Sequence, residues 1–128
     1  TPETPTVTGV TIVGFTGKDT SSDSSLVSGT WNMKSGSSVT YEGTAYNCAK
    51  IESGTAFNVN VPVGTKVTLV TKTTPNKLSV EGTNITAGFE DKSTYFTYTY
   101  TTSTNPSVIK KGSGSDANLA CIVIEPAE

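Results

Sequence analysis

Aromatic side chains in polar surroundings are the residues of this chain best suited to hold a ligand. A flat ring can lie against the apolar C–H face of a sugar while nearby amides, hydroxyls and charged groups hydrogen-bond to the polar rim of the sugar. Trp31 lies in a stretch of Gly, Thr, Asn and Lys, and is either an exposed ring that stacks on a ligand or a buried ring that fills the core. Tyr46 stands next to Asn47 and is either a ligand contact or a packed ring.

The segment from Thr94 to Thr101 alternates aromatic residues with Thr. Because successive side chains of a strand point to opposite faces, Phe96, Tyr98 and Tyr100 share one face, which we expect to belong to the core. Tyr95 shares the other face with the Thr residues, so we expect it at the surface and include it among the candidate binding residues.

Catalysis is poorly supported by the composition. The sequence has no His, Arg or Gln, which removes the usual proton shuttle at neutral pH, the usual base of a nucleophilic triad and the bidentate phosphate clamp. A glycosidase needs two facing carboxylates, and nothing in the pattern selects a pair from the five outside tails and loose loops. These are Glu42, Glu52, Glu81, Glu90 and Asp91. We therefore expect a protein that is not an enzyme.

No cofactor is expected, although a structural calcium ion is an open alternative. Ca²⁺ takes oxygen ligands, and five acidic residues could contribute without showing a fixed ligand spacing. They are Asp19, Asp23, Glu90, Asp91 and Asp116.

The two cysteines, Cys48 and Cys121, each lie within an expected strand. They form either a disulfide that ties distant strands together or two separate buried thiols. Two Cys without His match no zinc site.

Short alternating stretches, and no long segment with a helical period, predict an all-β chain. We expect a two-sheet antiparallel β-sandwich, jelly-roll-like, with about eight or nine strands separated by Gly-containing turns. The last strand is apolar on both faces and should be central in its sheet. Residues 17–25 show no pattern and are expected to form a long loop. The expected strands are 7–15, 39–41, 46–51, 57–63, 66–71, 77–80, 95–101, 107–110 and 118–125.

Charge and chain organisation limit the partners. The net charge is −2 and the Lys residues are scattered, so nucleic-acid binding is not expected. No apolar run is long enough to span a membrane. The Pro- and Thr-rich residues 1–6 resemble a linker, followed by one domain over 7–128, which we expect to be a monomer.

The order of segments in the second half carries a family resemblance. It runs through "GTAYNCAKIESGTAFNVNVPVGTKVTLVTKTTPNKLSVEGTNI", "STYFTYTY" and "PSVIKKGSGSDANLACIVIEP". This succession resembles the β-sandwich modules appended to secreted polysaccharide-degrading enzymes, such as pectate lyases and glycoside hydrolases, of gut and rumen Bacteroidetes. The Ala-Cys in the last strand departs from the aromatic-rich ending that is more common in those modules.

The resemblance implies a secreted, non-catalytic carbohydrate-binding module that docks an attached enzyme onto plant cell-wall polysaccharide of the β-glucan, xyloglucan, xylan or pectin type. It singles out Lys77, before "LSVEG", as a side chain that could bind sugar hydroxyls or a uronate, with Asn76 beside it. The candidate site is therefore Trp31, Tyr46, Asn76, Lys77 and Tyr95. The alternative is an immunoglobulin-like structural spacer or adhesion module without a sugar site.

Overall fold

The computed structural model describes residues 9–23, 25–52, 56–74, 77–112 and 117–126, and these ranges form strands and turns. They contain no helix long and apolar enough to cross a membrane. The strands are β1 (Thr11–Gly17), β2 (Thr20–Ser21), β3 (Val27–Gly29), β4 (Asn32–Tyr41), β5 (Thr44–Ile51), β6 (Ala56–Val59), β7 (Lys66–Thr71), β8 (Leu78–Val80), β9 (Thr83–Asn84), β10 (Phe89–Asp91), β11 (Phe96–Thr101), β12 (Ser107–Lys111) and β13 (Ala117–Glu125).

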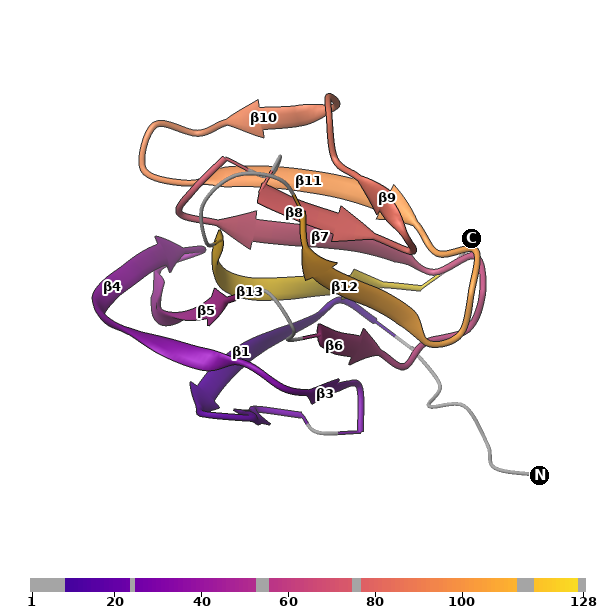
Figure 1. The fold of residues 1–128 in the computed structure, drawn as a ribbon, viewed down its shortest axis with the longest axis horizontal. Helices are drawn as coiled ribbons and strands as arrows, with labels where there is room; N and C mark the ends of the chain where they lie inside the picture. The colour runs from indigo at the N-terminus through magenta and orange to yellow at the C-terminus, as the bar shows by residue number, and fades with distance from the viewer. Residues whose placement is uncertain (1–8, 24, 53–55, 75–76, 113–116, 127–128) are drawn as a thin grey trace.

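The strands build two antiparallel sheets (Figure 1). The 8-stranded sheet has the order β10-β11-β7-β13-β1-β2, with β5 paired to β13 and β4 paired to β5. The 5-stranded sheet has the order β3-β6-β12-β8-β9. The chain crosses between the sheets several times, so strands adjacent in sequence often belong to different sheets. The expected all-β, two-sheet sandwich is confirmed.

A hydrophobic core drawn from both sheets joins them. It holds Val13, Leu69, Leu119, Ile122 and Ile124 of the larger sheet and Phe57, Leu78 and Ile109 of the smaller one, all fully buried. Strand β13 lies between β1 and β7, and its residues from Leu119 to Ile124 are buried. Its continuous apolar run is explained by this position, because both of its faces are covered.

A second cluster covers the opposite face of the 8-stranded sheet. It consists of Val39, Cys48, Val70, Ala120, Cys121 and Val123, and we call it the outer cluster. All six residues belong to β4, β5, β7 or β13, so this face is packed without any help from the smaller sheet. Ile12, Tyr41, Tyr46 and Tyr95 pack around the cluster and are partly exposed.

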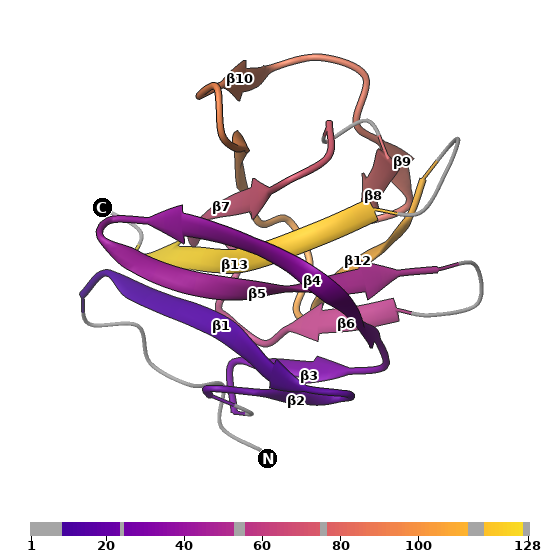
Figure 2. The ribbon, with the colours of Figure 1, turned by 90° about the vertical axis from the view of Figure 1, so that its left-hand side faces the viewer.

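The β4–β5 hairpin supplies part of this covering. Figure 2 shows the hairpin as a long curved ribbon lying in front of β13. Strand β5 pairs with β13 only near one end, from Ile51 to Ala49. Further along, Tyr46 lies over Gly14 of β1, where an added Cβ would come within 2.8 Å of the Tyr46 ring. A residue without a side chain at position 14 therefore lets the hairpin lie close to the sheet.

The structure corrects several expected boundaries. Residues 17–25 were expected to be a long loop, but β2 pairs there with the end of β1 in a short hairpin. The strand expected over 57–63 ends at Val59, before Pro62. Strand β4 starts at Asn32 rather than at residue 39, because a register shift between Met33 and Ser38 hides its alternation. The expected linker, residues 1–6, lies outside the described residues.

Candidate functional site

Trp31 belongs to the core and cannot stack on a sugar. Its side chain is 0% exposed and packs edge-on against Phe15 and Phe57, with ring centroids 4.9 Å and 6.0 Å away. Its indole N–H donates to the Gly17 carbonyl at 2.9 Å, and its backbone N–H donates to Asp19 Oδ1 at 2.7 Å. The polar groups of this buried residue are thus satisfied by Gly17 and Asp19, which lie well before it in the sequence. Of the two interpretations of Trp31, the exposed ring that stacks on a ligand is wrong.

Tyr95 lies on the outer face, opposite the core, as the alternation predicted. Phe96, Tyr98 and Tyr100 face the core side, where both Tyr rings pack against the core. Tyr95 instead packs edge-on against Tyr41 at the tip of the β4–β5 hairpin, with ring centroids 5.6 Å apart and an interplanar angle of 78°. Both rings are half-buried, so each keeps part of its surface open to solvent.

These two rings border a shallow hollow of about 320 Å³, which we call the outer groove. The hairpin tip forms one side, and the rest comes from the outer faces of β7, β10 and β11 together with Glu125 at the end of β13. Its lining residues are Tyr41, Glu42, Lys66, Thr68, Glu90, Lys92, Tyr95, Thr97, Thr99 and Glu125. Thr68 and Thr99 are cross-strand partners whose hydroxyl groups hydrogen-bond at 2.9 Å. The groove thus combines ring surface with an array of hydroxyl groups.

Charged groups of both signs surround the outer groove. Lys92 forms an exposed ion pair with Glu90 at 2.9 Å, and this hydrogen bond raises the pKa of the ammonium group. Lys66 is exposed and has no ion-pair partner among the described residues. Its ammonium group can therefore donate three hydrogen bonds to a ligand in the groove.

The Tyr41 phenol keeps its proton at neutral pH. Partial burial, followed by the negative charge of the neighbouring Glu42, raises its pKa above the ordinary value. The hydroxyl group at the groove wall is therefore a hydrogen-bond donor as well as an acceptor.

The other predicted site residues lie elsewhere. Tyr46 packs on the same outer cluster as Tyr95 but does not line the groove. Lys77 is half-buried next to β8 of the smaller sheet, where its carbonyl accepts a hydrogen bond from Gly112 N at 2.6 Å. Asn76 lies outside the described residues. The structure therefore brings Tyr46 and Tyr95 to one face and places Lys77 with the other sheet.

Sequence reasoning missed Tyr41, Lys66 and Lys92. A signal for Tyr41 existed, because it alternates with Val39 beside a Glu-Gly turn. The Thr residues of β11 were also within reach, since they share the face of Tyr95. Lys66 had no signal, because its place beside the groove depends on the pairing of β7 with β11, which are far apart in the sequence. Lys92 was within reach, since it lies close to Tyr95 in the connection between β10 and β11.

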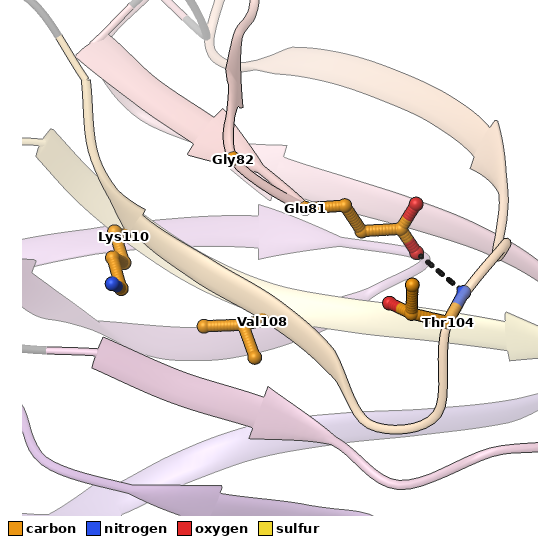
Figure 3. Close-up of a pocket in the computed structure, with 5 residues that line it drawn as sticks. All are labelled: Glu81, Gly82, Thr104, Val108 and Lys110. Atoms are coloured by element: carbon orange, nitrogen blue, oxygen red, sulfur yellow. Dashed lines mark hydrogen bonds between the residues drawn. The ribbon is translucent and has the colours of Figure 1, made fainter.

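Two further hollows adjoin Glu81. One of about 300 Å³ is lined by Glu81, Gly82, Thr104, Val108 and Lys110 (Figure 3). The other, of about 310 Å³, lies between β8–β9 and β11, and we call it the edge pocket. None of the described residues that line the hollow of Figure 3 is aromatic, so they offer no stacking surface.

The Glu81 carboxylate holds the loop between β11 and β12 in place. It accepts hydrogen bonds from Ser103 N at 3.1 Å, Thr104 N at 3.4 Å and Ser107 Oγ at 2.9 Å, and one from Ser103 Oγ. Partial burial raises the pKa of this carboxyl, but the hydrogen bonds led by that of the Ser103 hydroxyl outweigh it and hold the pKa below 4.5. Its hydrogen bonds give Glu81 a structural role.

The four described acidic residues considered as calcium ligands do not form one group. Asp19 accepts from the Trp31 backbone, Asp23 from Ser25, and Asp91 from Ser93 N at 2.8 Å. Asp116 lies outside the described residues. In the part of the chain that the structure describes, no three acidic, His or Cys residues form a group that could hold a metal ion.

Cys48 and Cys121 are separate thiols, fully buried in the outer cluster. Burial raises the pKa of both, that of Cys121 to about 12. The sequence left a disulfide and two separate buried thiols open, and the structure shows two separate buried thiols.

A comparison with protein-family models decides the kind of protein that carries this groove. The model described as carbohydrate binding module 77 matches residues 9–122, which is most of the chain. The chain belongs to this family. It is therefore a non-catalytic carbohydrate-binding module, and the immunoglobulin-like spacer without a sugar site is set aside. The expectation that the protein is not an enzyme is confirmed by the family.

A comparison with solved structures supports the fold of the module. One solved structure superposes on this chain with a TM-score of 0.65 at 22% sequence identity. It comes from a study of how the complexity of the Ruminococcus flavefaciens cellulosome reflects an expansion in glycan recognition. The match covers 95% of this chain and 97% of that chain. No curated protein matches the sequence.

Proposed function

We propose that the outer groove of this module binds plant cell-wall polysaccharide of the β-glucan, xyloglucan, xylan or pectin type. The observation that carries the proposal is the Tyr41–Tyr95 pair beside a row of Thr hydroxyl groups. The edge of one ring against the face of the other restricts both rings, so little conformational entropy is lost when a sugar lies against them. Tyr95 supplies ring surface, and Thr97, Thr99 and Lys66 lie within the same groove.

The open form of the groove suits an internal stretch of a polymer. Its lining comes from separate elements: the hairpin tip, the β10–β11 surface and β7, whose Thr68 hydrogen-bonds Thr99 of β11. Lys66 can bind sugar hydroxyls, or pair with a uronate in a pectin-type ligand. Glu42, Glu90 and Glu125 can accept hydrogen bonds from the hydroxyls of a neutral sugar.

We further propose that the module works as a monomer that docks an attached catalytic domain onto its substrate outside the cell. Attachment raises the local concentration of the enzyme at the polymer, so weak intrinsic affinity is sufficient. The family, and the cellulosomal origin of the structural neighbour, support an extracellular setting.

Affinity electrophoresis against β-glucan, xyloglucan, xylan, mannan and pectin gives a direct test. We expect retardation by at least one polymer, and about tenfold weaker binding for Tyr95→Ala, which is about 1.4 kcal/mol. Tyr95→Phe keeps the ring and should retain most of the affinity. Tyr46→Ala tests the third Tyr that packs on the outer cluster, which does not line the groove. Full retention of binding by Tyr95→Ala would move the site away from the outer groove.

A further inference from the structure

We propose that the edge pocket is a second saccharide site, on the side of β11 opposite the outer groove. The proposal rests on the proposed function only for the identity of the polymer. The pocket has a volume of about 310 Å³, at the lower end of the range for ligand sites. Its lining residues are Val80, Glu81, Thr83, Asn84, Tyr98, Tyr100, Thr101, Ser103 and Thr104.

The pocket exists because the two sheets differ in extent. Strands β10 and β11 form the edge of the 8-stranded sheet, and β8 and β9 form the edge of the smaller sheet. Figure 1 shows β10 at the outermost position of the larger sheet. The aromatic face of β11 is consequently only half-buried, although its alternation is that of a core strand.

Tyr98 and Tyr100 give the pocket an aromatic wall. Their rings are nearly parallel, with centroids 6.0 Å apart and an interplanar angle of 25°. The Tyr100 hydroxyl hydrogen-bonds Ser107 Oγ at 2.8 Å, which fixes that ring, and burial raises its pKa. Tyr98 is half-buried, and its Cε1 atom lies 3.6 Å from where a Cβ of Gly88 would be. The open part of the half-buried Tyr98 ring, backed by the stacked Tyr100 ring, is a suitable surface for the C–H face of a pyranose.

Polar groups stand beside these rings. Thr83 and Asn84 form the exposed strand β9, and among the described residues the Asn84 side-chain amide makes no hydrogen bond. An amide supplies two donors and one acceptor, which matches adjacent sugar hydroxyls. The opposite wall carries Ser103, whose loop is held by Glu81. The polar rim is thus positioned before a ligand arrives.

The two sites lie back to back, because Tyr98 and Thr99 are neighbours on β11 and point to opposite faces. A short oligosaccharide therefore cannot occupy both sites of one molecule. The module should bind two separate chains of a polysaccharide and hold them together.

The test is an NMR titration of the folded module with an oligosaccharide of the polymer that retards it. We expect two groups of amide shifts, one at Thr97 and Thr99 and one at Thr83, Asn84 and Ser103. Asn84→Ala should weaken only the second group, by about three- to tenfold. Tyr98→Leu, which keeps apolar bulk against the core, should do the same, and Tyr95→Ala should weaken only the first. Asn47→Ala, at another exposed strand position, is the matched control.

The outcomes separate the two proposals. Shifts confined to Thr97 and Thr99 overturn the second site and leave the outer groove intact. Shifts at the edge pocket that persist in Tyr95→Ala, with none at the groove, support the second site and overturn the outer groove. A wild-type module that no polymer retards and no oligosaccharide shifts overturns both.

Discussion

The role of a single side chain in this protein follows from its contacts, and Trp31 is the clearest case. A polar sequence context suggested surface exposure, yet the ring is fully buried with its N–H satisfied by a backbone carbonyl. Polar neighbours in the sequence therefore do not show whether a side chain points into the core or toward the solvent.

Replacement of Trp31 should cost stability and leave glycan binding intact. Removing a fully buried indole creates a large cavity, so Trp31→Ala should lower the free energy of unfolding by about 3–5 kcal/mol, as measured by guanidinium denaturation. Trp31→Phe retains apolar bulk, and its folded form should be retarded by polysaccharide like the wild type. Loss of binding in folded Trp31→Phe would contradict the core assignment.

The buried thiols should be unreactive in the native state. Because burial raises the pKa of Cys121 to about 12, the reactive thiolate is scarce at pH 8, and the fully buried sulfur is also shielded from reagents. We expect slow reaction with an aromatic disulfide reagent in buffer and rapid reaction of two thiols in denaturant. Fewer than two thiols in denaturant without reductant would mean that Cys48 and Cys121 are bridged.

Among the connecting elements, the loop between β11 and β12 depends on one carboxylate. Glu81 accepts its hydrogen bonds best when ionised, and its pKa in the folded state lies below 4.5. Its contribution to stability is therefore present above pH 4.5 and is lost as the pH falls through the lower pKa of the folded state.

Glu81→Gln should consequently lower stability by about 1–2 kcal/mol at pH 7 and approach the wild type at low pH. Denaturation curves collected between pH 2 and pH 7 test this convergence. Glu90→Gln is the control, since Glu90 forms only an exposed ion pair and its loss should change stability by about 0.5 kcal/mol or less. A constant difference between Glu81→Gln and wild type across this range would argue against the ionised carboxylate.

The β4–β5 hairpin is the element that creates the outer groove. It carries Tyr41 to Tyr95, and its close approach depends on Gly14 beneath Tyr46. The groove therefore depends on contacts between β1, the hairpin and the β10–β11 edge, which are distant in sequence.

The whole molecule is held together by a core to which both sheets contribute. We expect the two sheets to unfold together, since neither can keep its apolar face buried without the other. Trp31 fluorescence and far-UV circular dichroism should give coincident denaturation transitions. Separate midpoints would show that the sheets unfold independently.

Local alternation was enough to predict the β class and the two faces of β11, because both follow from a period of two along one strand. The central place of β13 was predicted from its continuous apolar run, because a strand covered on both faces has no polar side. Local patterns could not predict which strands meet, since pairing depends on contacts between distant segments. The burial of Trp31, the separation of Lys77 from Tyr95, and the joining of Tyr41, Lys66 and Tyr95 in one groove all follow from that packing. The family order of segments pointed to carbohydrate binding, and the folding of the hairpin over the larger sheet gave that function a candidate site.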